Sequence, residues 1–388
     1  MNISGIIAEY NPFHSGHARQ IAETRRLLGE DAAVVCAMSG NWVQRADCAI
    51  ADKWTRAAVA LKGGADLVLE LPTPWAISSA ERFARGAVEV LSAAGVVSHL
   101  SFGSESGSLE ELRAAAVCLD SQAYPSALRR ALDQGLPFPA ARQEAVRALI
   151  GPAADVLSAP NNNLAVEYLR ALPGSMEAVA IPRTGAGHDQ APAAGFASAS
   201  WLRGRLRAGY PDAAAPYLTG PWIWETADLV RCERAILARL RSMTLEQAEA
   251  LPDSGDGLAA RLLAAGKAAT TLEEVYALTK TRRYTHARVR RLVLWAFLGL
   301  TAADRPEHVP YLRVLGFNDR GRAVLREMWK HARLPILTKP AHVRTLSPAA
   351  RRLFELEDRC TDLYGLCLPT AAPGGREWTT NPAILPFK

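Results

Sequence analysis

The sequence lacks the features typical of membrane, secreted and metal-scaffold proteins. Its longest apolar run, Leu292 to Leu300, is far shorter than the roughly 20 residues that a bilayer span requires. No basic region precedes the apolar residues at the N-terminus, and Glu9 interrupts them, so no signal peptide is predicted. The six cysteines include no C-x-x-C pair, which favours reduced, mostly buried thiols. We therefore expect a soluble, cytoplasmic protein with no membrane partner.

Two common nucleotide-binding motifs are also missing. The sequence contains neither the phosphate-binding loop G-x-x-x-x-G-K-[ST] nor the dinucleotide motif G-x-G-x-x-G. What is present is an ordinary globular composition, since 49% of the 388 residues are hydrophobic and 22% are charged. A chain of this length can bury a large core and predicts two domains.

Charge is distributed unevenly along the chain. Residues 1–200 carry 16 Lys and Arg against 20 Asp and Glu, a net of −4, whereas residues 201–388 carry the remaining 29 and 19, a net of +10. Between Arg282 and Lys339 there are 13 basic and 4 acidic side chains. This asymmetry favours a polyanion such as nucleic acid as a partner of the second half. A solvated, arginine-rich surface is the alternative.

The first 200 residues alternate short apolar, β-branched runs with amphipathic stretches. Strands are expected at Ile3–Glu9, Ala33–Met38, Asp66–Leu71, Val96–Phe102 and Glu177–Ile181, with helices between them. Apolar strands separated by helices indicate a parallel sheet covered on both faces, so we predict a doubly wound α/β fold.

The break at Gly209-Tyr210-Pro211-Asp212 ends this alternation. Beyond it the chain reads as almost wholly helical, most clearly over Thr285–Leu300. We therefore predict an α/β domain over residues 1–214 and a mostly helical, basic domain over residues 215–388.

The turn after the first expected strand, NPFHSGH at residues 11–17, is a candidate phosphate site. His14 and His17 lie where a strand meets a helix, and backbone N–H groups and the helix dipole bind phosphate there in open α/β sheets. Gly16 leaves room for a nucleotide to approach the backbone. Imidazole donors would stabilise charge that develops at an α-phosphorus. No cluster of metal ligands surrounds the pair, so no metal site is expected; a turn glycine beside two structural histidines is the alternative.

A second candidate phosphate site is ASASWLR, residues 197–203, at the start of the last helix of the α/β region. It resembles the Ser/Thr-rich helix start, followed by arginine, of nucleotidyltransferases. The resemblance implies that hydroxyl and N–H groups of Ser198 and Ser200 face the β- and γ-phosphates, with Arg203 as a two-pronged donor. A plain helix N-cap is the structural alternative for the serines.

The H-x-G-H turn resembles that of the nucleotidyltransferase superfamily, and seven dispersed strings resemble more closely the tRNA(Met) cytidine acetate ligase family. In chain order the strings are GIIAEYNPFHSGH, MSGNWVQR, GADLVLELP, FGSESG, PNNNLAVEYL, RTGAGHD and RRYTHARVRRL. The sequence differs from the family pattern at Ala46, where glycine is usual, and before His188-Asp189, where an aromatic residue is usual.

The resemblance implies an ATP-dependent ligase that activates acetate as acetyl-adenylate. The acetyl group then passes to the N4 amine of the wobble cytidine of elongator tRNA(Met), which gives N4-acetylcytidine. The implied partners are ATP, acetate and tRNA, with Mg²⁺ on the triphosphate and no DNA. Two alternatives remain open: a small-molecule adenylyltransferase of the same superfamily, and a non-catalytic RNA-binding protein with a relic nucleotide pocket.

The resemblance also assigns site residues, with His14 and His17 as the catalytic pair nearest the phosphates. The implied ATP-binding segment consists of Ile7, Ala8, Glu9, Tyr10, Asn11, Pro12, Phe13, His14, Ser15, Gly16, His17 and Gln20. Further ATP contacts are expected from Gly103, Arg183, Ser198, Ser200 and one of Asn161 and Asn162, of which Asn162 is preferred, and the acetate pocket from Gln44 and Arg45. A turn at Gly103, an N-cap within Asn161–Asn163 and a surface role for Arg183 are the structural alternatives.

Two further sets of residues are interpreted as structural. Asp66 and Glu70 are expected to form buried pairings, and Trp222, Trp224 and Trp295 to belong to the core of the helical domain. Contacts to tRNA are expected instead from Arg282, Arg283, Arg288, Arg290 and Arg291. In the helix expected over Thr285–Leu300, the apolar stripe consists of Val289, Leu292, Val293 and Ala296. Arg283 and Arg290 lie away from this stripe, so they should face solvent.

Overall fold

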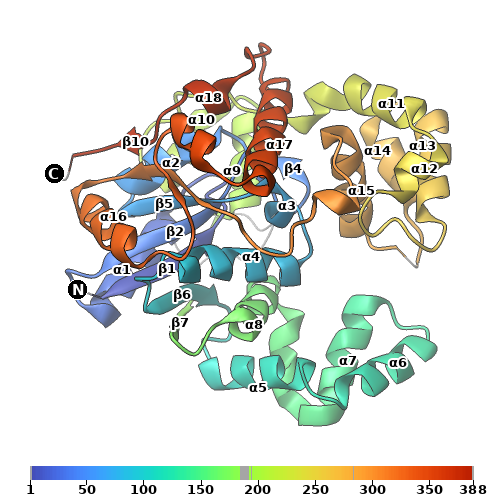
Figure 1. The fold of residues 1–388 in the computed structure, drawn as a ribbon. Helices are drawn as coiled ribbons and strands as arrows, with labels where there is room; N and C mark the ends of the chain where they lie inside the picture. The colour runs from blue at the N-terminus through green and yellow to red at the C-terminus, as the bar shows by residue number, and fades with distance from the viewer. Residues whose placement is uncertain (1, 184–191, 194, 283, 387–388) are drawn as a thin grey trace.

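The computed structural model describes residues 2–183, 192–193, 195–282 and 284–386. Its centre is an eight-stranded sheet in the order β10-β8-β5-β2-β1-β6-β7, with β9 beside β8 (Figure 1). The sheet is parallel except where β5 and β8 pair antiparallel. The strands are β1 (Ile3–Ala8), β2 (Ala33–Ser39), β5 (Leu67–Leu71), β6 (His99–Ser104), β7 (Glu177–Pro182), β8 (Leu312–Phe317), β9 (Ile336–Leu337) and β10 (Ala383–Ile384).

Strand β2 shows why the sheet is covered on both faces. Its alternate side chains divide between two cores: Cys36 packs with residues of α1 (Ser15–Leu28) and α2 (Lys53–Lys62), whereas Val35 packs with residues of α4 (Ala80–Ala93) and α16 (Asp319–His331). Both faces of the strand are therefore apolar, as a buried parallel strand requires. The predicted α/β class with a mostly parallel sheet is confirmed.

The remaining elements of the first half surround this sheet. A short hairpin, β3 (Trp42–Val43) and β4 (Asp47–Cys48), follows β2. The other helices are α3 (Thr73–Ala76), α5 (Leu109–Leu119), α6 (Tyr124–Asp133), α7 (Phe138–Ile150), α8 (Pro160–Ala171) and α9 (Ala199–Arg207), with a 3₁₀ segment at Gly151–Ser158.

The second half of the chain divides in two. Helices α11 to α15 form a lobe beside the sheet (Figure 1, yellow to orange), and the chain then returns to the sheet as β8, α16, β9 and β10. The helices here are α10 (Pro211–Ala214), α11 (Glu233–Ser242), α12 (Leu245–Glu249), α13 (Leu258–Ala268), α14 (Leu272–Thr279), α15 (His286–Leu298), α17 (Pro348–Gly365) and α18 (Arg376–Thr379), with 3₁₀ segments at Ala215–Tyr217, Leu229–Cys232, Ala302–Asp304 and Pro340–Thr345.

The return of the chain to the sheet was not expected, because we read residues beyond 212 as almost wholly helical. Strand β8 is six residues long and nearly all buried, so it has no alternation of polar and apolar residues. A short, fully buried strand of this kind cannot be distinguished from a helical segment by periodicity.

A buried ionic cluster joins the late part of the chain to the sheet. Lys53 of α2 pairs with Glu70 of β5 at 2.6 Å and also with Glu377 of α18. Arg313 of β8 binds the second oxygen of Glu377 at 2.8 Å. Glu357 of α17 accepts hydrogen bonds from the backbone N–H and hydroxyl of Thr73. Since an unpaired buried charge is strongly destabilising, these late segments belong to the same folding unit as the sheet.

The other structural interpretations have mixed outcomes. Asp66 is buried against Arg25 at 2.7 Å, and Glu70 against Lys53, so both predicted pairings are confirmed. All six cysteines are free and buried, as expected. Trp295 is a core residue, but Trp222 and Trp224 are only half-buried. Among the described residues, no helix is both long and apolar enough to cross a membrane.

Candidate active site

The turn between β1 and α1 is held by a reciprocal pair of histidine hydrogen bonds. His14 is the N-cap of α1, and its Nδ1 accepts from the Gly16 backbone N–H at 3.1 Å. The Nδ1 of His17 accepts in turn from the His14 backbone N–H at 3.2 Å. The two side chains thus do what Ser and Glu do in an ordinary capping box.

This arrangement fixes the tautomer of each ring. Because each Nδ1 accepts a hydrogen bond, the proton of each neutral imidazole lies on Nε2. Burial, reinforced by Arg183 and Arg203, lowers the pKa of His14 to about 3. Burial, with His14 and Arg183 nearby, also holds the pKa of His17 well below its usual value. Both rings are therefore neutral N–H donors at physiological pH.

A cavity of about 390 Å³, which we call the sheet-edge cavity, opens beside these rings at the carboxyl ends of the parallel strands. It contains residues of the turn, of β6, of α8 and of the start of α9. Of the predicted site residues it brings together Ile7, Ala8, Glu9, Tyr10, Asn11, His14, His17, Gln20, Gln44, Arg45, Gly103, Arg183, Ser198 and Ser200. Open α/β sheets bind ligands at this edge.

The charges around the sheet-edge cavity favour an anion. Its described lining includes Arg45, Arg183 and Arg203, against the single carboxylate of Glu9. With both histidines neutral, the lining carries a net charge of +2. A triphosphate is a suitable ligand for such a set of donors at the start of a helix.

Hydrogen bonds to the backbone shape the wall of the cavity. Arg203 of α9 donates to the Asn11 carbonyl at 2.7 Å, and the Asn11 side chain accepts from the Ile50 N–H at 2.7 Å. Glu9 accepts from the Gln44 N–H at 2.8 Å, which places Gln44 and Arg45 at the cavity. The second motif and the acetate candidates are thus bonded to the first turn.

Ala46 departs from the family pattern, in which glycine is usual. Its backbone conformation explains why glycine is usual there. Its φ is +57°, a left-handed conformation that a side chain disfavours, and the residue is fully buried. The loop after β3 therefore keeps the conformation that glycine adopts most readily.

Both serines at the start of α9 line the sheet-edge cavity, and one of them also caps the helix. Ser198 is the N-cap, with its hydroxyl accepting from the Trp201 N–H at 3.3 Å, so the structural alternative is correct for that oxygen. Its hydroxyl also lies 3.2 Å from that of Ser200. Both residues line the sheet-edge cavity, so a capping role and a cavity position are compatible here.

Five predicted residues of the turn and asparagine segments lie outside this cavity, namely Pro12, Phe13, Ser15, Gly16 and Asn162. Gly16 lines a narrow extension of it beside His14 and Arg183. Asn162 is buried and accepts from the Ser104 hydroxyl at 2.8 Å and the Glu105 N–H at 2.9 Å. It therefore holds the loop after β6. Pro12 and Phe13 line a different pocket.

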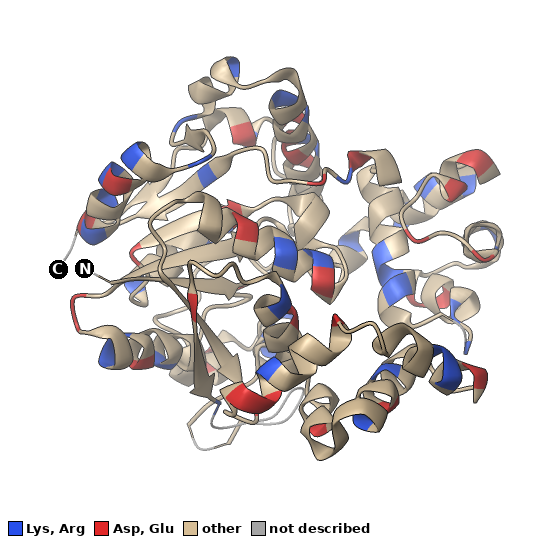
Figure 2. Cartoon of the chain, turned by 60° about the horizontal axis from the view of Figure 1, so that its bottom comes forward, with Lys and Arg blue, Asp and Glu red and all other residues tan. Residues whose placement is uncertain are grey.

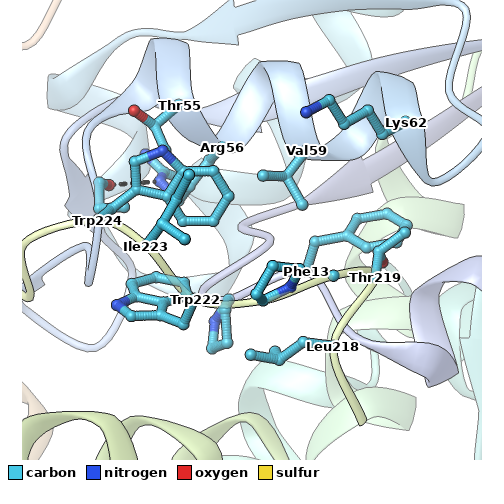
Figure 3. Close-up of a pocket in the computed structure, with 14 residues that line it drawn as sticks. Phe13, Thr55, Arg56, Val59, Lys62, Leu218, Thr219, Trp222, Ile223 and Trp224 are labelled. Atoms are coloured by element: carbon cyan, nitrogen blue, oxygen red, sulfur yellow. Dashed lines mark hydrogen bonds between the residues drawn. The ribbon is translucent and has the colours of Figure 1, made fainter. Parts of the chain in front are cut away.

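That different pocket, which we call the apolar pocket, lies behind the turn. Figure 3 shows Phe13, Trp222, Ile223 and Trp224 around it, and its volume is about 190 Å³. The guanidinium of Arg56, at its edge, is bonded to backbone carbonyls of Glu9, Ser39, Gly40 and Ala51. The hydrogen-bonding capacity of this guanidinium is therefore used within the fold, which leaves Lys62 as the other cation of the apolar pocket.

The predicted tRNA contacts have a less simple arrangement. Figure 2 shows positions of Lys and Arg interspersed with positions of Asp and Glu along the ribbon. The apolar stripe of α15 is buried as predicted. Arg290, however, is half-buried rather than solvent-facing, because its guanidinium lies over the Tyr276 ring at 5.2 Å. Arg283 and residues 184–189, which include His188 and Asp189, lie outside the described residues.

Comparison with known proteins identifies the family. The profile of the HIGH nucleotidyl transferase family matches residues 1–377. The tRNA(Met) cytidine acetate ligase of Acetivibrio thermocellus is 34% identical, over 99% of this chain and 100% of that protein. The protein of the same name from Syntrophotalea carbinolica is 36% identical over 97% of each. This chain belongs to the tRNA(Met) cytidine acetate ligase family.

The fold of this family member is also that of solved structures. The apo form of Thermotoga maritima TmcAL matches with a TM-score of 0.91, and the form bound with alpha-thio ATP matches with a TM-score of 0.90. Each is 28% identical, with full coverage of both chains. The predicted fold and family are confirmed.

Several residues that line the sheet-edge cavity of this ligase-family chain were not named from the sequence. An apolar wall comes from Ala80, Phe83, Phe102, Leu164 and Tyr168, and a further polar group comes from Asn163. Asn161, the alternative to Asn162, also lines the cavity. Asn161 and Asn163 flank Asn162, the residue preferred from the sequence as an ATP contact. A helix-period reading of α8 would have placed Asn161 and Leu164 on one face.

The described residues offer few ligands for a metal ion. Within the described part of the chain no three His, Cys, Asp or Glu side chains converge on one point. Glu9 is the single described carboxylate in the sheet-edge cavity. The residues present therefore do not fit a protein-bound Mg²⁺ site.

Proposed function

We propose that this protein is an ATP-dependent tRNA(Met) cytidine acetate ligase. The observation that carries the proposal is the sheet-edge cavity: a net positive pocket with two neutral imidazole N–H donors at a helix start, in a chain of this family. ATP is the ligand that fits the position and the charge of the cavity, and T. maritima TmcAL has been solved with alpha-thio ATP. Mg²⁺ would neutralise charge on the triphosphate.

The first half-reaction joins acetate to AMP. A carboxylate oxygen of acetate attacks the α-phosphorus, and the bond to pyrophosphate breaks. No protein nucleophile is needed, so the chain supplies position and positive potential. The Nε2–H groups of His14 and His17, with Arg183 and Arg203, are the donors for charge that develops on the phosphate oxygens.

The second half-reaction transfers the acetyl group to RNA. The exocyclic N4 of the wobble cytidine attacks the acetyl carbonyl, the C–N bond forms, the C–O bond to AMP breaks, and N4 loses a proton. The base must leave its stack and reach the adenylate to do this. Gln44 and Arg45, fixed near the cavity by Glu9, form the acetate pocket.

The division of labour follows the chain. Residues 1–214 carry the ATP chemistry, and residues 215–388 supply contacts to tRNA phosphates, which act through counterion release and fix the register of the RNA. Support for this comes from the net charge of +10 on residues 201–388, against −4 on residues 1–200. Among the arginines of α15, Arg288 also donates to the Asp253 carbonyl at 2.7 Å within the lobe of helices α11 to α15.

Exchange of labelled pyrophosphate into ATP tests the proposal. Exchange that depends on acetate is expected, because acetyl-adenylate formation is reversible. Exchange without acetate would indicate an adenylyltransferase using another acceptor, and ATP binding with no exchange would indicate a relic pocket.

A further inference from the structure

A second cavity, which we call the adjoining cavity, lies next to the sheet-edge cavity. Its volume is about 330 Å³, and Ser200 and Arg203 line both. The other walls come from the hairpin residue Asp47, the segment Asp228–Val230, and α14 and α15. It is therefore built where the sheet meets the helical lobe.

Two residues that line this cavity carry a buried polar atom with no hydrogen-bond partner among the described residues. Tyr276 is 1% exposed, and among the described residues its hydroxyl has no hydrogen-bond partner. The buried Nε of Arg290 likewise has none within that part of the chain. The Arg290 guanidinium lies over the Tyr276 ring, so both groups belong to one wall. Buried polar groups are normally paired, so these two groups can accept a partner such as water or a bound ligand.

The charged side chains that line the adjoining cavity balance one another, unlike those of the sheet-edge cavity. Arg203, Arg207 and Arg290 are balanced by Asp47, Asp228 and Glu273. Arg207 binds Asp47 through both terminal nitrogens at 3.1 Å. A neutral lining does not favour an anion, but it offers donors, acceptors and an aromatic side chain to a neutral heterocycle.

We propose that the adjoining cavity receives the cytosine ring that is acetylated, with Tyr276 and Arg290 as the residues that bind it. The inference rests on the proposed function and names the subsite of its second substrate. A cytosine presents a donor at N4 and acceptors at N3 and O2, which are complementary to the carboxylates of the lining and to the donors of Tyr276 and Arg290. The shared residues Ser200 and Arg203 place the amine beside an adenylate in the sheet-edge cavity.

Gly204 of α9 allows the cavity to be filled without disturbing the fold. It lines the adjoining cavity, is exposed, and a Cβ built on it meets no described atom within 4 Å. Replacing a helical glycine removes a destabilising residue. Gly204→Phe should therefore fold and block the base, and Gly204→Ala is the matched control with a small side chain.

The test compares three quantities in each variant: acetate-dependent pyrophosphate exchange, acetyl transfer to a tRNA(Met) transcript, and the melting temperature. Gly204→Phe should reduce transfer by roughly 5- to 150-fold, the range for loss of one stacked base, with exchange and melting unchanged. Gly204→Ala should keep both reactions. Tyr276→Phe should reduce transfer by about 2- to 10-fold, the effect of one hydrogen bond. Tyr311→Phe, which removes another buried hydroxyl without a partner among the described residues, should have no effect.

The outcomes separate the two proposals. If the wild-type protein forms no acetylcytidine, the proposed function itself fails. If wild-type transfer is normal and folded Gly204→Phe also transfers normally, the base binds elsewhere and the inference is overturned. Equal loss of exchange and transfer would overturn it too, because the cavity would then serve ATP. If Gly204→Phe does not fold, acetyl transfer by Tyr276→Phe is compared with transfer by Tyr311→Phe. Equal transfer by these two variants would overturn the inference.

Discussion

The imidazole rings of His14 and His17 are stacked, with centroids 3.8 Å apart and an interplanar angle of 25°. Together with the reciprocal bonds to the backbone, this stacking leaves each ring its Nε2–H as the available donor. The capping of α1 and the proposed binding of phosphate therefore use opposite edges of the same two side chains.

The two roles of His17 should be separable by substitution. His17→Ala removes both the cap and the donor, so it should lose about 1 kcal/mol of stability and about 10²–10³-fold in exchange rate. His17→Gln keeps an acceptor for the His14 N–H, as in a capping box, but has no Nε2–H at the same place. It should lose exchange to a similar extent while keeping the wild-type melting temperature. An active His17→Gln protein would show that the ring is only a cap.

The low pKa of His14 predicts a loss of stability in acid. The unfolded chain takes up a proton near pH 6.5, whereas the folded protein resists protonation until about pH 3. Stability contributed by this residue is therefore present above pH 6.5 and lost as the pH falls toward 3, by about 2 kcal/mol at pH 5. His14→Asn retains an N-cap but does not titrate. Urea titrations from pH 7 to 5 should show a smaller loss for this variant, and parallel curves would contradict the assignment.

Glu357 predicts a trend of opposite sign. Burial and the neighbouring Glu70 raise its pKa to about 8, so the folded protein holds this proton more tightly than the unfolded chain does. Its contribution to stability is complete below about pH 4.5 and is lost as the pH rises through 8, by roughly 3 kcal/mol between pH 5 and pH 8. Glu357→Gln mimics the protonated form. Its stability relative to the wild type should increase with pH, and a constant difference would disprove a neutral Glu357.

Ala46 should be improved by the residue that the family pattern contains. The left-handed conformation costs alanine about 1–2 kcal/mol of folding free energy. Glycine avoids this cost, but its more flexible unfolded chain lowers stability by about 0.4–1 kcal/mol. Ala46→Gly should therefore raise the free energy of unfolding by about 1 kcal/mol. Ala57→Gly, in the interior of α2, is the control and should lose at least about 1 kcal/mol. Denaturant unfolding measures both changes, and a destabilised Ala46→Gly protein would show that this loop is not strained.

A cut at residue 214 should separate strands that belong to one sheet. A chain ending there lacks β8 and the partners Glu377 and Arg313 of the buried Lys53–Glu70 pair, so it should not fold. Replacing residues 233–298, which lie in the helical lobe, by a short linker keeps the whole sheet. That protein should still exchange pyrophosphate with acetate but lose transfer to tRNA. A folded, exchange-active fragment 1–214 would contradict the role given to the late strands.

The sequence predicted the elements that follow a regular pattern and missed those that tertiary contacts decide. The β1–α1 turn was predictable because a strand, a helix start and two histidines fall within a few residues. Strand β8 was not, since it is short and buried on both faces. Arg290 was placed in solvent from the helix pattern alone, but α14 packs beside α15 and brings the Tyr276 ring under its guanidinium.

The choice among neighbouring asparagines shows the same limit. Asn161 and Asn162 follow each other, and the sequence gives no reason to prefer either. The fold decides between them because the loop after β6 takes the amide oxygen of Asn162, and this leaves Asn161 at the cavity. Long-range hydrogen bonds of this kind depend on which strand ends meet, and local periodicity carries no information on that.

The central claim is tested most directly by analysing the nucleosides of tRNA(Met) after incubation with the protein, ATP and acetate. The account predicts N4-acetylcytidine at the wobble position, one AMP and one pyrophosphate released for each acetyl group, and no product when acetate or ATP is omitted. The His17→Ala protein should give little product under the same conditions. Unmodified cytidine in the presence of active, folded wild-type protein, or an adenylylated product that retains AMP, would contradict it.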